Sequence, residues 1–519
     1  MKNFIRLIVL FALVFVAGCD KDDLNQPVFG TQENSNYYQN ADQIKEALTG
    51  AYLQLRITWD EFALNHYMVG DVTTDDAWKG GANEADYMPL ADLQNFTATP
   101  TNHVAARRWN ILYKLIARSN EVIHFAQTAA GDETLLQRYI NEAKLLRGFA
   151  YYELVTVFGG VPLVLEPLTP SEAVQVPRAS EEEVFNQIIT DLNDATALPT
   201  KSEYGPDDQY RVTSGLAYTL LGKLYMFMRD FEAAEEALAQ VVNSGEYALL
   251  PDYGANWRIE NSVESVFEIN NQMTDERELA LGSNIPLFFS TRTTPGYPGY
   301  GFHLPTLDLF KAFAPDDPRI AYTFVMEGDR FVGDSPQTAN QDNSLSPSGF
   351  GDRKTLVPQI LRTEYNPWMV DYNVRLIRYS DVLLLYAEAL NENGKSAEAL
   401  TYLNMVRERA RNTPPLDPQR SIQTYIPETT ESTLSPITTT DQDELRDIIW
   451  HERRVELGME GWRREDLVRQ ERYMEVMLEF AAEYNTLKGA DFDPTDILLP
   501  IPQTEIDYSN GVIQQNPGY

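Results

Sequence analysis

The strongest hydrophobic periodicity of the chain lies in residues 375–410, where apolar positions recur every three or four residues. This spacing puts the apolar side chains on one face of a helix. Asn393-Gly394 interrupts the pattern, and such a pair readily adopts the left-handed conformation that ends a helix. The segment is therefore predicted to form two helices that fold back antiparallel. The two stripes are Val382, Leu385, Tyr386, Ala389 and Leu390, and then Ala399, Leu400, Leu403, Val406 and Ala410.

Residues 215–243 carry a second copy of this pattern. Gly222 and Ala234 are separated by the same interval as Ala387 and Ala399, and large apolar residues follow at matching offsets. Alternating small and large positions of this kind are typical of tetratricopeptide helical pairs. An ordinary helical hairpin remains the alternative interpretation.

Other segments with helical periodicity surround these hairpins. Asn120 and Arg147 fall on apolar stripes, so we expect Asn120 to hydrogen-bond to a loop and Arg147 to pair with a carboxylate. Ser180 and Glu183 have the spacing of a capping box. The predicted helices cover residues 41–57, 106–127, 133–158, 180–198 and 442–470.

Two stretches lack such periodicity. Residues 58–105 are predicted to be irregular, and residues 245–372 contain six prolines between positions 286 and 318, which excludes long helices there. A few short strands, such as Ser265–Asn270, are expected. The predicted fold is mainly α: tetratricopeptide-like hairpins in 41–244 and 373–519, with an irregular, loop-rich subdomain at 245–372, all within one domain spanning 41–519.

The amino-terminal residues 1–18 have the pattern of a signal peptide, with Lys2 and Arg6 before an apolar run too short to span a bilayer. Val16-Ala17-Gly18-Cys19 looks like a lipobox, which predicts lipidation of Cys19; an ordinary secretory peptide is the alternative. Residues 19–40 are expected to form a tether. The acidic residues 20–23 are either a surface-export tag or a solvated linker.

Composition narrows the possible functions. The formal net charge of −35 argues against nucleic-acid binding, because phosphates would be repelled. Cys19 is the single cysteine, which excludes an intramolecular disulfide and argues against a cysteine-based active site or metal site. His451-Glu452 lacks the second histidine of a zinc-protease helix, and no phosphate-binding loop or nucleophile elbow is present. No metal or other cofactor is predicted.

Several blocks of the sequence resemble one known family, the SusD/RagB nutrient-binding lipoproteins. The resemblance implies a mainly α protein that is lipid-anchored in the outer membrane, exposed at the cell surface and not an enzyme. It would capture a glycan and deliver it to a TonB-dependent transporter of the SusC type. The alternatives are a peptide-binding relative and, more remotely, a surface glycoside hydrolase. Besides the lipobox, the blocks are Trp109–Asn120, Glu142–Pro162, Arg378–Asn391, Glu452–Leu467 and Leu499–Tyr519.

A glycan site needs exposed aromatic planes with polar neighbours, and three aromatic residues fit this description. Trp78 lies beside Asp75, while Tyr297 and Tyr300 lie among glycines where no helix can bury them. We expect these four residues to contact the ligand, although local packing under loops would also explain the aromatic ones. The cluster Asp71, Asp75 and Asp76 is interpreted as a solvated turn rather than a calcium site. Trp109, Trp450 and Trp462 are assigned to the core.

Overall fold

The computed structural model describes residues 37–56, 62–271, 282–292, 299–326, 347–356, 370–414, 434–486 and 488–519. The predicted signal peptide, Cys19 and most of the predicted tether lie outside these residues. Within them, no helix is both long enough and apolar enough to cross a bilayer.

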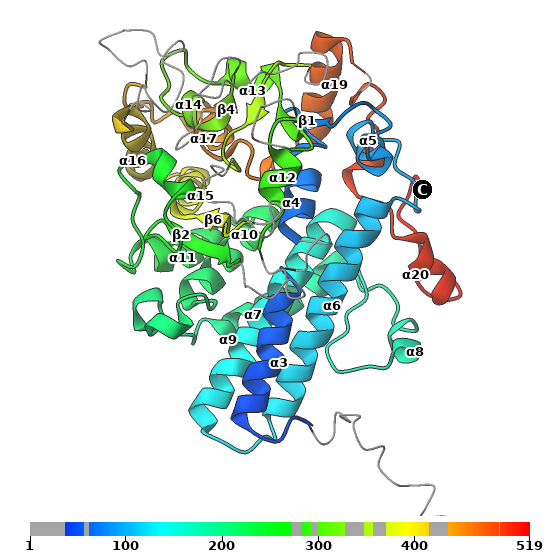
Figure 1. The fold of residues 1–519 in the computed structure, drawn as a ribbon. Coiled ribbons are helices and arrows are strands. Elements are labelled where there is room, and N and C mark those ends of the chain that lie inside the picture. Colours follow the sequence, from blue (N-terminus) through cyan, green and yellow to red (C-terminus); the bar gives the residue numbers. More distant parts are fainter. Residues whose placement is uncertain are drawn as a thin grey trace, which may run out of the picture.

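Four helices lie side by side in the lower part of the molecule (Figure 1). Each begins at a side chain that accepts hydrogen bonds from the first free backbone amides, such as Asn102 for α6 and Asp132 for α7. The predicted capping box of Ser180 and Glu183 is confirmed at the start of α9. These helices are α3 (Ala41–Leu53), α6 (His103–Ala126), α7 (Glu133–Phe158) and α9 (Glu181–Ala195).

The predictions for Asn120 and Arg147 are confirmed in the contacts of α6, α7 and α9. The Arg147 guanidinium donates to both oxygens of Asp191, at 2.7 and 2.8 Å. It also donates to Asn120 Oδ1 at 2.8 Å, and Asn120 Nδ2 donates to the carbonyl oxygen of Val164 at 2.8 Å. This buried chain of polar contacts connects three helices to the loop that follows α7.

The two predicted hairpins are present and stack on each other, α11 against α15. At Gly222 a Cβ atom would lie 2.5 Å from the Leu238 side chain, so only glycine permits this helix spacing. Gly394 has φ +74°, as expected for the residue that ends the first helix of its hairpin. The mainly α, tetratricopeptide-like fold is thus confirmed. The hairpins are α10 (Ser214–Met228) with α11 (Phe231–Val242) and α15 (Tyr379–Glu392) with α16 (Ser396–Asn412).

The helix predicted for residues 442–470 is divided in two. α17 (Gln442–Leu457) packs on α15, and α18 (Arg463–Arg469) follows after a turn. Gly461 in this turn has φ +84°, and a Cβ atom there would lie 2.5 Å from the His66 ring. The turn therefore brings the backbone close to α4. Two later helices complete the carboxyl end: α19 (Tyr473–Tyr484) and α20 (Gln503–Tyr508).

The expectation that residues 58–105 are irregular was wrong for three short elements of the described part, whereas residues 72–76, 81–87 and 95–102 are irregular as expected. α4 (Phe62–Asp71) is buried on every side, so its sequence shows no polar stripe and no helical period. β1 (Ala77–Gly80) and α5 (Met88–Gln94) follow it. The short elements between α7 and α10 are α8 (Pro170–Ala173), η2 (Lys201–Glu203) and η3 (Pro206–Asp208).

Short elements replace long helices between α11 and α15. The predicted strand is confirmed as β2 (Ser265–Ile269), which pairs antiparallel with β6 (Val374–Arg378) directly before α15. This pairing brings together the two ends of the irregular segment between the hairpins, so the hairpin stack continues across that segment. Two further strand pairs are present, β1 with β3 and β4 with β5. The other elements of this region are η4 (Tyr253–Trp257), α12 (Ile285–Phe289), β3 (Phe302–Pro305), α13 (Leu307–Ala312), α14 (Ile320–Thr323), β4 (Phe324–Val325) and β5 (Gly351–Asp352). Near the carboxyl end lies η6 (Pro494–Ile497).

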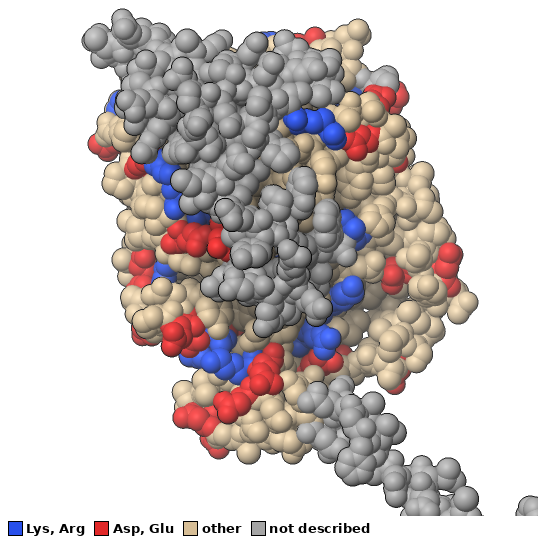
Figure 2. Space-filling model, in the orientation of Figure 1, with Lys and Arg blue, Asp and Glu red and all other residues tan. Residues whose placement is uncertain are grey.

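Fully buried ion pairs lie beneath the β2–β6 pair. Arg378 donates to Glu264 at 2.9 Å, to Glu456 at 3.0 Å and to Glu460 at 2.7 and 2.8 Å. The charges are neutralised within the cluster, as burial requires. On the face shown in Figure 2, acidic and basic side chains of the described residues are interspersed rather than gathered by sign.

Candidate functional site

Trp78 lines a hollow between β1 and α19, which we call the β1 pocket. Its volume is about 560 Å³. The Trp78 ring is half-buried and packs on Phe480 of α19 at 5.4 Å between ring centroids, while Tyr484, one turn further along α19, also lines the pocket. The two rings that reach solvent, Trp78 and Tyr484, provide apolar faces in a concave site.

The conformation of the turn after β1 is fixed by left-handed glycines, a close backbone contact and hydrogen bonds from a lysine. Gly80 and Gly81 have φ +73° and +81°, and a Cβ atom at Gly80 would lie 2.1 Å from the Gly301 carbonyl oxygen. Lys79 Nζ closes the turn by donating to the carbonyl oxygens of Asn83 at 2.9 Å and Asp86 at 2.7 Å. The polar residues of this turn therefore occupy fixed positions at the pocket edge.

Amide side chains surround the two rings. Asn83, Gln94, Asn95 and Asn485 all line the β1 pocket, and each amide group can both donate and accept hydrogen bonds. Flat apolar faces next to such amides suit a ligand with apolar C–H faces and many hydroxyl groups. No pair of carboxylates in this lining faces a common point, so nothing in the described part of the pocket indicates glycoside hydrolysis.

Asp75 does not line this pocket. It is 2% exposed and receives hydrogen bonds from Arg463 at 2.9 Å on both oxygens, while Arg454 lies 2.7 Å away. Burial opposes its ionisation, but the two arginines outweigh it and hold the pKa of Asp75 below its usual range. Asp71, Asp75 and Asp76 are all buried, so their interpretation as a solvated turn was wrong, and Asp75 supports β1 from beneath instead of facing a ligand.

A buried lysine lies behind the Trp78 ring. Lys488 Nζ is 5.3 Å from the Trp78 ring centroid and donates to the carbonyl oxygen of Ala77. Burial lowers its pKa to about 7, against the opposing attraction of the three buried aspartates Asp71, Asp75 and Asp76. The buried support of Trp78 therefore includes a lysine whose pKa lies near neutrality.

His303 fixes the strand that pairs with β1. Its Nε2 lies 2.9 Å from Asp71 Oδ2 and its Nδ1 lies 3.1 Å from Asp352 Oδ2, with all three side chains fully buried. Burial alone would lower the pKa of His303, but hydrogen bonds from the ring to Asp352 and Asp71 raise it to about 9. The imidazolium joins α4, β3 and β5 under the pocket.

Of the other two aromatic residues predicted to contact the ligand, the structure describes only Tyr300. Tyr297 lies outside the described residues. Tyr300 is half-buried and meets Phe288 edge to face at 5.3 Å; its neighbour Gly301 accepts a hydrogen bond from Gly81 at 2.7 Å. The structure thus brings Tyr300 next to the β1 turn, although it does not line the β1 pocket.

The tryptophans assigned to the core are mostly confirmed. Trp109 and Trp462 are 2% and 3% exposed. Trp450 is only half-buried, and its Nε1 donates to Glu388 at 2.7 Å. Sequence reasoning missed Phe480, Tyr484 and Lys488, because α19 carries no local feature that marks it as part of a site built by β1.

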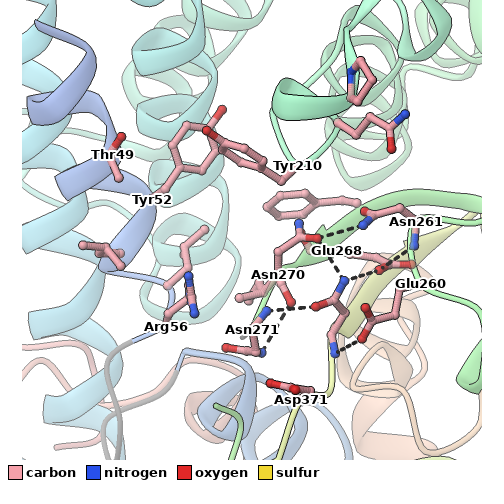
Figure 3. A pocket seen from close by; sticks show the side chains of 17 residues that line it. Thr49, Tyr52, Arg56, Tyr210, Glu260, Asn261, Glu268, Asn270, Asn271 and Asp371 are labelled. Carbon is pink, nitrogen blue, oxygen red and sulfur yellow. Dashed lines mark hydrogen bonds between the residues drawn. The ribbon is translucent and has the colours of Figure 1, made fainter. Parts of the chain in front are cut away.

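A second hollow of about 560 Å³ lies between the end of α3, the segment after η3, and the β2–β6 pair; we call it the amide pocket. Figure 3 shows Tyr52 and Tyr210 close together on one side, with their rings in T-shaped contact at 6.5 Å. Asparagine and carboxylate side chains line the other side. These are Glu260, Asn261, Glu268, Asn270, Asn271, Asp371 and Asn373.

Comparison with known proteins identifies the family. One family model, described as the SusD family, matches residues 264–519. A second, described as starch-binding associating with outer membrane, matches residues 31–226. The chain belongs to the SusD family. The resemblance seen in its sequence blocks is thereby confirmed.

Relatives of this SusD-like protein match it over nearly the whole chain. SusD-like protein P38 of Formosa agariphila is 27% identical over 511 residues, covering 92% of this chain and 94% of the relative. Surface glycan-binding protein A from Bacteroides fluxus superposes with a TM-score of 0.76 at 25% identity, covering 93% of this chain and all of its own. A laminarin-binding SusD-like protein superposes with a TM-score of 0.74 at 25% identity, with the same coverage.

Proposed function

We propose that this SusD-like protein binds oligosaccharide or polysaccharide chains without cleaving them, and that the β1 pocket is the binding site. The observation that carries the proposal is the pair of rings, Trp78 and Tyr484, that reach solvent among four amide side chains. The names of the similar glycan-binding and laminarin-binding proteins support the same class of ligand. Tyr297 and Tyr300 are proposed as further ligand contacts on the basis of the sequence.

Anchoring and delivery form the second half of the proposal. Cys19 would carry lipid after removal of residues 1–18, and residues 19–40 would tether the single domain 41–519 to the outer leaflet. The family description, starch-binding associating with outer membrane, supports this location. The partner would be a TonB-dependent transporter of the SusC type that receives the glycan. Membrane fractionation tests the anchor, because Cys19→Ala would release the protein from the outer-membrane fraction.

Affinity electrophoresis and calorimetry with a panel of polysaccharides, laminarin first, test the binding site. Trp78→Ala and Tyr484→Ala are each expected to weaken binding at least tenfold, about 1.4 kcal/mol, since each removes one stacking face. Tyr508→Ala is the matched control, because Tyr508 is 68% exposed on α20 and lines neither pocket. Binding that survives both pocket substitutions would contradict this assignment.

The same panel separates the alternatives. Oligopeptides that bind in place of glycans would indicate the peptide-binding relative. Release of new reducing ends from a polysaccharide by the purified protein would indicate a surface glycoside hydrolase, and would overturn the non-catalytic role.

A further inference from the structure

We propose that the amide pocket is a second carbohydrate site, separate from the β1 pocket, and that it takes a neutral sugar ring with adjacent free hydroxyl groups. The inference rests on the proposed glycan binding for its general ligand class, but it uses different residues. The amide pocket is built by α3, the segment after η3, and the β2–β6 pair, whereas the β1 pocket is built by β1 and α19.

The polar side of the amide pocket is a connected network. Asn270 Oδ1 accepts from Asn261 Nδ2 and from Asn373 Nδ2, both at 2.9 Å. Asn373 Nδ2 also donates to Glu268 at 3.1 Å, and Asn373 Oδ1 accepts from the Asn271 backbone amide at 2.9 Å. Each amide is thus held in one orientation before any ligand arrives, which reduces the entropy that binding costs.

One acceptor in this network has no donor among the residues that the structure describes. Asn271 is 6% exposed, and its Nδ2 donates to the carbonyl oxygen of Tyr372 at 3.0 Å. Its Oδ1 accepts no hydrogen bond from any described residue, although it is buried in the pocket wall (Figure 3). A buried carbonyl without a donor costs about 1–3 kcal/mol, and an O–H or N–H group of a ligand would relieve this cost once a small movement of the side chain opens the oxygen to the pocket.

The charges of the lining define the class of ligand further. Of the described residues, three carboxylates, Glu260, Glu268 and Asp371, line the pocket against one cation, Arg56, so the lining is net negative and disfavours a carboxylate or sulfate. Glu268 Oε1 also receives no hydrogen bond from the described part of the chain, although it forms an ion pair with Arg375 Nε at 3.6 Å. The pocket is therefore rich in acceptors, and a neutral polyol matches it better than a uronic acid or sulfated sugar.

Tyr210 supplies the apolar face that a sugar ring requires. It is 40% exposed, and Arg211 lies over its ring at 5.4 Å from the centroid. Tyr52 lies behind it, and the Tyr52 hydroxyl donates a hydrogen bond to Glu142 at 2.9 Å. One open ring opposite a wall of fixed amides makes a site for a single ring or a chain end, not for a long stacked chain.

Saturation-transfer NMR and calorimetry on the purified protein test the proposal with the methyl glycosides of glucose, galactose, mannose and xylose, and with methyl glucuronide. At least one neutral glycoside is expected to bind at millimolar concentration, and methyl glucuronide at least tenfold more weakly. Tyr210→Ala and Asn271→Asp are each expected to reduce that binding at least tenfold. Tyr508→Ala should leave it unchanged.

Three results would overturn the inference: no neutral glycoside binds, binding persists in Tyr210→Ala, or glucuronide binds as tightly as the neutral sugars. Circular dichroism of each variant shows whether it folds, and Tyr210→Ala is a surface change that tests the site even if Asn271→Asp does not fold. Polysaccharide binding that depends on Trp78, with no glycoside bound at the amide pocket, would refute this second site and leave the proposed function intact.

Discussion

Replacement of His303 tests whether a charged imidazole holds the support of the β1 pocket together. We choose His303→Asn, because His303 has φ +58° and asparagine tolerates this left-handed conformation better than most residues. The asparagine amide is too short to donate to Asp71 and Asp352 at once, which the ring does at 2.9 and 3.1 Å. Two buried carboxylates would then lie near each other without a cation between them.

The size of the effect follows from the pKa of His303. In the folded protein this pKa is about 9, against an ordinary value of 6.5, and such a difference corresponds to roughly 3 kcal/mol. Because the folded pKa is raised, this contribution to the free energy of unfolding is fully present below pH 6.5. It is lost as the pH rises through about 9.

The assay is urea unfolding of the wild type and His303→Asn, followed by circular dichroism at several pH values. The difference in unfolding free energy between the two proteins should be roughly 3 kcal/mol larger below pH 6.5 than above pH 9. His124→Asn is the control, because the His124 side chain is 52% exposed. A difference that stays constant across this range would show that His303 is neutral and that the reasoning is wrong.

Three further substitutions test the packing and the buried charges. The difference in unfolding free energy between wild type and Lys488→Met should rise by up to roughly 5 kcal/mol between pH 7 and 10.5, because the penalty of burying a charged lysine disappears as the folded protein loses that proton. Urea titration of both proteins measures this difference. Glu456→Gln should lower the free energy of unfolding by about 3–5 kcal/mol at neutral pH in the same assay. The loss should be smaller in acid, where the wild type also loses this charge, and the exposed Glu471→Gln should change the free energy of unfolding hardly at all. Gly222→Ala should lower the melting temperature because its Cβ meets a leucine at 2.5 Å, whereas Gly50→Ala, with nothing within 4 Å, should raise it.

Long amphipathic helices could be predicted from the sequence because one polar face marks their period. α7 begins at Glu133 and ends at Phe158, the limits that its pattern predicts. The α4 helix was not predicted because it is buried on all sides and has no polar face that would reveal its helical period. β6 was missed for a related reason, since its arginines look like surface positions but are buried by ion pairs to distant glutamates.

The site could be predicted only where local sequence carried the information. Trp78, in a segment without helical periodicity, was predicted to be an exposed aromatic, and the structure places it on β1 in the wall of a pocket. Asp75 was misassigned because its partner Arg463 lies 388 positions away in the chain. The other half of the β1 pocket comes from α19, and the amide pocket joins segments that are spread from Thr49 to Asn373, so no local pattern could reveal either.

Both pockets depend on one helix that lines neither of them. β1 and β2 are strands of four and five residues, too short to be stable by themselves. α17 supports both through two residues that are two positions apart and so face different directions. Arg454 donates to Asp76 at 2.8 Å beneath β1, and Glu456 accepts from Arg378 at 3.0 Å beneath the β2–β6 pair. Loops above these strands can therefore vary to suit different ligands, while changes in α17 should disturb both pockets at once.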